Sequence, residues 1–224
     1  VMTVFAVLAS QRYATEHALR EYSHELLKNV IDETRENAAG FLRRAHDSVA
    51  LATNVFEAGL LQFDDVGQIE RYFLEQLRVV PQIDALYYGD QYGNFVFSKR
   101  SAEGDGFLTK LIQVEAASPE RVTLIRRDQH LAETSRSFDP EDRYDPRERP
   151  WYVRAMRHND EIWTDPYIFF TAKQPGVTVA AAVWKPGSPN TGVIGADIKL
   201  SALSEFLKTQ RIVTSGKAFI IDRE

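Results

Sequence analysis

The stretch YDPRERPWY, residues 144–152, combines arginines, prolines and large aromatic residues in a way that a plain core element rarely does. The guanidinium of Arg149 offers a planar fork of donors that fits a carboxylate. Trp151 and Tyr152 each add a hydrogen-bond donor on a rigid apolar ring. Pro150 restricts the backbone between them, which limits how far the side chains drift apart. The stretch therefore predicts a site for a small anion.

Two later segments supply candidates for the opposite end of such a ligand. Tyr167 closes WTDPY, and Asp197 lies within the apolar run VIGADI. A buried carboxylate without a partner is costly. Asp197 therefore caps the helix expected over SALSEFL, bonds to backbone, or holds a cation. The last alternative, together with Arg149, predicts a zwitterionic ligand.

For Arg149 the competing interpretation is a structural salt bridge to a nearby carboxylate, since surface ion pairs are common. The neighbouring candidates are Asp142, Asp145 and Glu148. The aromatic residues around Arg149 favour the ligand role.

Taken together, YDPRERPWY, WTDPY and GVIGADI resemble the double Cache (dCache) family, the extracytoplasmic ligand-binding modules of bacterial chemoreceptors, histidine kinases and nucleotide cyclases. The resembling part runs from about Glu36 to the end of the chain. The resemblance implies an α+β fold in which a long N-terminal helix packs on a PAS-like antiparallel sheet (the Cache fold). The ligand would lie in this membrane-distal module.

The amino-acid-binding subset of that family carries a pattern that this chain matches position by position. By the resemblance, one group faces the ligand carboxylate and comprises Tyr144, Arg149 and Trp151. The other group faces its ammonium and comprises Tyr152, Tyr167 and Asp197. One departure is Thr171-Ala172, where many relatives have Thr-Gly after the PY motif, so the rim of the pocket is expected to differ.

Hydrophobic periodicity gives the expected elements. Residues 12–61 contain no proline and repeat apolar residues every three or four positions, which predicts one long helix. A second helix is expected over 65–79, with Asp65 as its cap. Strands are expected over 83–100, 107–115 and 121–127, a short helix from Trp151 to His158, three more strands over YIFFTA, GVTVAAAVWKP and TGVIGADIKL, and a helix over SALSEFLKTQ.

The resulting domain organisation has four parts. Residues 1–11 are apolar enough to be the end of a transmembrane helix, 12–61 form the long helix, 62–215 form the membrane-distal Cache domain, and 216–224 begin a truncated membrane-proximal module. The long helix exceeds the needs of one domain, which predicts a homodimer contact through it.

Composition argues against other classes of function. The 224 residues carry a net charge of −5, have no basic stripe, and include no cysteine. Nucleic-acid binding and thiolate chemistry are therefore not expected. The five histidines are scattered and no nucleophile, base or metal set assembles, so neither catalysis nor a metal or cofactor is expected.

The sequence thus predicts the ligand-sensing domain of a bacterial transmembrane signalling receptor, anchored in the inner membrane and facing the periplasm or the cell exterior. The expected ligand is an amino acid or a related amine. Three alternatives stay open: the same fold sensing a small organic acid, a ligand-free structural or dimerisation spacer, and a soluble interaction domain whose long helix is the functional surface.

Overall fold

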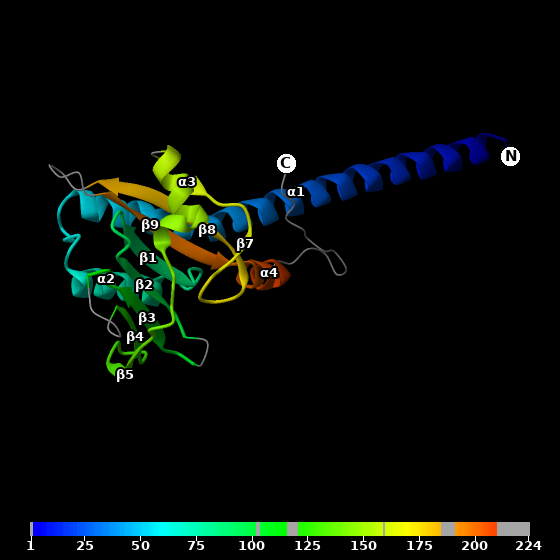
Figure 1. Ribbon diagram of the computed structural model, residues 1–224. Coiled ribbons are helices and arrows are strands. Elements are labelled where there is room, and N and C mark those ends of the chain that lie inside the picture. The colour runs from blue at the N-terminus through cyan, green and yellow to red at the C-terminus, as the bar shows by residue number, and fades with distance from the viewer. Residues whose placement is uncertain (1, 102–103, 116–120, 159, 185–190, 210–224) are drawn as a thin grey trace. The chain divides into compact units, whose positions relative to one another are not determined.

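A nine-stranded antiparallel sheet forms the centre of the compact unit made by residues 41–204 (Figure 1). The computed structural model describes residues 2–101, 104–115, 121–158, 160–184 and 191–209. The strands are β1 (Ala85–Asp90), β2 (Phe95–Arg100), β3 (Phe107–Ile112), β4 (Val122–Arg127), β5 (Glu133–Phe138), β6 (Ile162–Trp163), β7 (Tyr167–Ile168), β8 (Pro175–Trp184) and β9 (Thr191–Lys199). Their order is β5-β4-β3-β2-β1-β9-β8-β6, with β7 also paired to β8. The predicted antiparallel α+β fold is confirmed.

The long helix predicted at the N-terminus is α1 (Met2–Glu57), and Gly59 at φ 70° follows its end. Glycine adopts this left-handed conformation without steric cost. From Phe41 onward the helix belongs to the same compact unit as the sheet. There it buries one face completely, through Ala45, Val49, Ala52 and Phe56. Within the described part of the chain, no helix combines the length and apolar character needed to cross a membrane.

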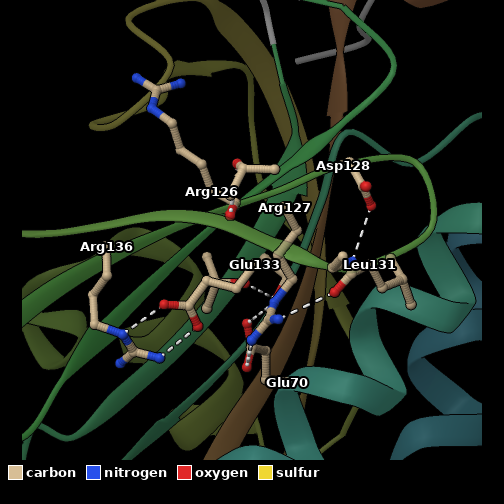
Figure 2. Close-up of polar contacts among 11 residues, drawn as sticks. Glu70, Arg126, Arg127, Asp128, Leu131, Glu133 and Arg136 are labelled. Atoms are coloured by element: carbon tan, nitrogen blue, oxygen red, sulfur yellow. Dashed lines mark hydrogen bonds and ion pairs between the residues drawn. The ribbon is translucent and has the colours of Figure 1, made fainter.

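Helix α2 (Val66–Val79) packs on the same face of the sheet and begins where the sequence predicts. The side chain of Asp65 caps it by accepting a 2.9 Å hydrogen bond from the backbone N–H of Gln68. Figure 2 shows how the helix is tied to β4: Arg127 pairs with Glu70 through two hydrogen bonds of 2.8 and 2.9 Å. Both side chains are largely buried, so this pair fixes α2 against the sheet.

The opposite face of the sheet, which we call the cavity face, carries a second buried core. Helix α3 (Pro150–His158) lies on it and contributes Trp151 and Tyr152. From the strands come Tyr87 and Phe97, which belong to the same buried cluster. Because side chains alternate along a strand, Leu86 and Tyr88 face the core under α1 and α2 instead.

Several elements differ from the expectation. Strand β5 was not predicted, because ETSRSF lacks the alternation of apolar residues that marks a strand. In the structure it is an edge strand, and every one of its residues is exposed. The run YIFFTA forms only the two-residue β7 and then turns. The helix expected over SALSEFLKTQ is α4 (Leu200–Thr209). The module expected over 216–224 lies outside the described residues.

Candidate ligand-binding site

The stretch 144–152 folds as two short turns of helix joined at Arg149. The carboxylate of Asp145 accepts a hydrogen bond from the backbone N–H of Arg147 and so caps a 3-10 turn, Pro146–Glu148. Arg149 is extended (φ −87°, ψ 146°) and its carbonyl accepts the backbone N–H of Val153 at 3.0 Å, within α3. The break between the two helical segments therefore sets the position of the Arg149 side chain.

Pro146 and Trp151 anchor this segment against β1. A Cβ atom added to Gly89 would lie 2.9 Å from Cβ of Pro146 and 3.2 Å from the Trp151 ring. Glycine at this position therefore permits the close approach. The Trp151 ring also lies 4.7 Å from the ring of Tyr87, measured between centroids. The motif is thus held by packing on the sheet, and Arg149 projects from a rigid base.

A small cavity opens beside this motif on the cavity face. It is lined by five of the six residues that the sequence proposes for the ligand: Tyr144, Arg149, Trp151, Tyr167 and Asp197. The strands and the segment after β7 complete its wall with Asp84, Tyr87, Phe97, Phe169, Phe170, Thr171 and Ala172. Its volume is about 20 Å³, room for a single water molecule. A larger ligand enters only if part of the wall moves.

Asp197 is the buried carboxylate of this cavity. Tyr87 and Thr178 both donate hydrogen bonds of 2.6 Å to its Oδ1 atom. The hydroxyl of Tyr167 in turn lies 2.8 Å from the hydroxyl of Thr178. Three hydroxyl groups are thus hydrogen-bonded to this carboxylate oxygen, two directly and one through Thr178. Burial raises the pKa of Asp197 to about 7, although both hydrogen bonds act to lower it. Among the described residues, Oδ2 has no hydrogen-bond partner and no cation pairs with the carboxylate.

Arg149 is the cation of the cavity and has no carboxylate within ion-pair distance among the residues that the structure describes. Two of the carboxylates considered as its salt-bridge partners are taken by others. Asp142 pairs with Lys110, and Asp145 pairs with Arg147. The Arg149 guanidinium instead lies 5.5 and 5.4 Å from the ring centroids of Tyr144 and Phe170. A cation in that position remains available to an anion in the cavity.

Tyr152 is the one proposed site residue that does not line the cavity. Its ring packs edge-on against Trp151, at 5.5 Å between centroids. Burial, and to a smaller extent the nearby charge of Asp90 at the end of β1, raises the pKa of Tyr152 to about 12. Tyr152 thus contacts the ring of Trp151, which lines the cavity, without being part of the wall itself.

The segment after β7, residues 169–174, forms a tight turn over the cavity, and we call it the lid turn. Its ends are closed by hydrogen bonds of 2.9 Å between Phe169 N–H and the Gln174 carbonyl, and between Lys173 N–H and the Phe169 carbonyl. Lys173 has φ 51°, a conformation that non-glycine residues rarely adopt. Phe170 remains 36% exposed above the cavity. The departure from Thr-Gly to Thr171-Ala172 therefore falls on the part of the wall that lies at the surface.

Sequence reasoning missed the residues that hold Asp197 and complete the wall. Tyr87 and Phe97 read only as apolar strand residues, and Thr178 as an ordinary strand threonine. Tyr87 pairs with Phe97 in the sheet, and both line the cavity. Thr178 pairs directly with Asp197 and so reaches its carboxylate. Only the alternation of inward positions along each strand could have pointed to them, once the register was known.

A larger cavity, of about 490 Å³, lies elsewhere and has different chemistry. Its wall includes Tyr88 and Val96 from the face that α1 and α2 cover, with Asp64 and Glu115 on the exposed loops. A third carboxylate, Asp90, is already occupied by the amide groups of Tyr92 and Asn94. The described residues that line it offer no cation for a carboxylate, so it does not match a zwitterion.

The fold, with its cavity between the sheet and the arginine-aromatic motif, is that of a sensor domain. Residues 94–205, half of the chain, match the family of methyl-accepting chemotaxis protein-like first PDC sensor domains. The chain belongs to this family. It is therefore a sensor domain and not an enzyme, as the sequence predicted.

Part of this chain is also similar to part of a chemotaxis protein and to part of a cyclase. Methyl-accepting chemotaxis protein McpB of Bacillus subtilis is 41% identical over 78 residues, which is 34% of this chain and 11% of that protein. Adenylate cyclase 1 of Rhizobium meliloti is 34% identical over 79 residues, which is 35% of this chain and 11% of that protein. The matched part thus spans about a tenth of the length of these relatives.

Solved structures share the fold. The sensory domain of the Campylobacter jejuni chemoreceptor Tlp3 superposes with a TM-score of 0.55 at 16% identity, covering 84% of this chain and 66% of that one. The ligand-binding domain of the Pseudomonas fluorescens chemoreceptor CtaA, in complex with L-serine, gives a TM-score of 0.50 at 22% identity, covering 82% and 63%. The resemblance confirms the predicted sensor fold.

Proposed function

We propose that the unit of residues 41–204 binds a free amino acid, with Arg149 on its carboxylate and Asp197 on its ammonium. One observation carries the proposal: a guanidinium and a carboxylate, neither ion-paired within the described residues, line the same cavity. Burying either charge alone is costly, and a zwitterion would satisfy both. Tyr144 and Trp151 would flank the carboxylate, and Tyr167 the ammonium.

The relatives support this assignment. The Tlp3 domain has been solved in complex with L-valine, with a TM-score of 0.54 to this chain, and the CtaA domain in complex with L-serine. Both ligands are free amino acids. At 16% and 22% identity, the similarity to these proteins extends to the fold. Which amino-acid side chain this chain prefers depends on its own residues.

The cavity volume of about 20 Å³ also favours a second candidate, a ligand-free spacer. Two features weigh against it. A spacer has no need of an unpaired arginine beside an unpaired, buried aspartate. The lid turn would also supply a movable part of the wall, because Phe170 is partly exposed. Its ring contacts are to Tyr144, at 5.1 Å between rings, and to the nearby cations Lys110, Arg149 and Lys173. Displacement of this turn would enlarge the cavity.

Signalling would follow from a shift between an open and a closed lid turn. A ligand moves such an equilibrium only by binding one state more tightly. In the full-length protein we propose that this domain is anchored to the inner membrane and faces the periplasm or the cell exterior. Helix α1 is the proposed dimer contact, since Leu19, Tyr22 and Leu26 are exposed at spacings of three and four.

A thermal-shift screen tests the function directly. The twenty amino acids are compared with small dicarboxylic acids that lack an amine, at a concentration far above the expected dissociation constant. A ligand that binds only the folded chain raises the melting temperature. At least one amino acid should do so. If no amino acid raises it, the spacer is favoured, and if only the amine-free acids do, Asp197 does not bind an ammonium.

A further inference from the structure

Three lysines stand on the cavity face of the sheet, one each on β2, β3 and β9. Lys110 is ion-paired with Asp142. Lys199 is paired with Asp84 at 2.6 Å. Lys99 has neither a hydrogen bond nor an ion pair with any described residue, although only 8% of its surface is exposed. Of the three, Lys99 is therefore the one whose amine the rest of the described chain leaves unpaired.

Lys99 lies in the same row of the sheet as the proposed ammonium site. It pairs across β1 with Ala85, and Ala85 pairs with Asp197 on the other side. Directly paired residues point to the same face of a sheet. Phe97, two residues before Lys99, lines the cavity, and alternation along the strand puts Lys99 on that face as well. Only the small side chain of Ala85 separates Lys99 from Asp197.

The charges that act on Lys99 are those of the cavity wall. Burial lowers its pKa, while Asp84 and Asp197 act to raise it and Lys199 to lower it. Asp84 already neutralises Lys199, and both carboxylates line the cavity. The amine of Lys99 is thus partly removed from water and has no partner among the described residues, and an anion entering the cavity would pair with it.

A zwitterionic ligand does not balance these charges. Its carboxylate would neutralise Arg149 and its ammonium would neutralise Asp197, which leaves Lys99 without a partner. We propose that the ligand is an acidic amino acid, with one ammonium and two carboxylates, and that Lys99 binds the side-chain carboxylate. This proposal rests on the amino-acid site described above and extends it to the ligand side chain.

The spacing in the sheet agrees with such a ligand. Two strand separations, about 10 Å in all, lie between the Cα atoms of Lys99 and Asp197. Side chains stand roughly perpendicular to a sheet, so the charged groups of Lys99 and Asp197 keep about this spacing. That leaves room for a hydrogen bond of about 2.9 Å at each end and for the few bonds that join the ammonium and the side-chain carboxylate of aspartate or glutamate.

The test uses ligands that differ only in charge. Dissociation constants are measured by calorimetry for glutamate against glutamine and for aspartate against asparagine. The wild-type chain should bind one of the acids at least about 30-fold more tightly than its amide, the lower end of what a buried charge pair contributes. If the wild type binds neutral amino acids as tightly as the acids, Lys99 does not select the ligand, while the amino-acid site itself stands. If it binds no amino acid, both proposals fail.

Variants of Lys99 complete the test. Lys99→Met keeps all but the last atom of the side-chain length and removes the charge, so the acid-over-amide preference should disappear while affinity for neutral amino acids stays within about threefold. Lys99→Arg should keep the preference. Lys208→Met is the control, since its amine pairs with Glu205 on the surface of α4, with 70% of the side chain exposed. An equal loss of acidic and neutral ligands in folded Lys99→Met would overturn the proposal. Should Lys99→Met not fold, the wild-type acid and amide pairs and Lys99→Arg decide it.

Discussion

The phenol of Tyr87 on β1 donates a 2.6 Å hydrogen bond to the carboxylate of Asp197 on β9, 110 residues further along the chain. The bond holds the buried carboxylate in one orientation, with Thr178 donating to the same oxygen. It does not remove the cost of burial, because the pKa of Asp197 still rises to about 7. The aspartate is thus positioned for a cation but incompletely satisfied without one.

The stability of the ligand-free protein should fall as the pH rises from about 4 to about 7. In this window the folded protein binds the Asp197 proton more tightly than the unfolded chain, whose aspartate has a pKa of about 4. Stability falls with pH wherever the folded state binds more protons. Urea unfolding at pH 5 and at pH 8 measures the difference. Asp197→Asn should be less sensitive to this change, and an equal slope in both proteins would refute the assignment.

Amino-acid affinity should show the opposite trend. A ligand ammonium requires an ionised Asp197, so below its pKa of about 7 the affinity should drop by about tenfold per pH unit. Binding near pH 7 should release a fraction of a proton. Calorimetry in two buffers with different heats of ionisation measures that release. A proton count of zero at pH 6 to 7 would show that Asp197 does not meet the ammonium.

Arg149→Ala should weaken amino-acid binding by about 2–5 kcal/mol, the usual cost of removing one partner of a buried charge pair. Arg147→Ala is the matched control, because Arg147 lies two residues away, pairs with Asp145 and does not line the cavity. Titration calorimetry on the two variants compares them. Equal dissociation constants for Arg149→Ala and the wild type would remove Arg149 from the site.

The sequence predicted those parts of the site that local chemistry specifies. Arg149 and Trp151 lie in one short motif whose prolines and aromatic rings fix their neighbourhood, and Asp197 is conspicuous as a charge in an apolar strand. Tyr87 and Lys99 were not predictable in the same way. Their roles depend on the register by which β1 pairs with both β2 and β9, and no local signal carries a pairing between segments 110 residues apart.

The helices and strands likewise fall into those that local sequence features predict and those that depend on pairing between distant segments. Helices α1 and α2 follow from apolar periodicity and from the Asp65 cap, which are local features. Strand β5 is stabilised by pairing with β4 alone and exposes all of its residues. The lid turn likewise replaces a predicted strand, because its backbone turns at Lys173 and closes on its own hydrogen bonds.

Gly195→Ala should disturb both the fold and the site. Gly195 pairs directly with Tyr87, and an added Cβ would lie 2.3 Å from the Tyr87 ring and 2.9 Å from its hydroxyl oxygen. Since Tyr87 is buried, the ring must shift away from Asp197, and overpacking of this kind costs about 1–3 kcal/mol. Gly40→Ala is the control: Gly40 is in α1, and apart from the helix's own nearby backbone no described atom lies within 4 Å of the added carbon, so alanine should add about 0.5–1 kcal/mol of stability. Urea unfolding gives both values, and calorimetry should show weaker amino-acid binding for Gly195→Ala alone. Unchanged binding in that variant would mean that the hydrogen bond from Tyr87 does not position Asp197 for the ligand.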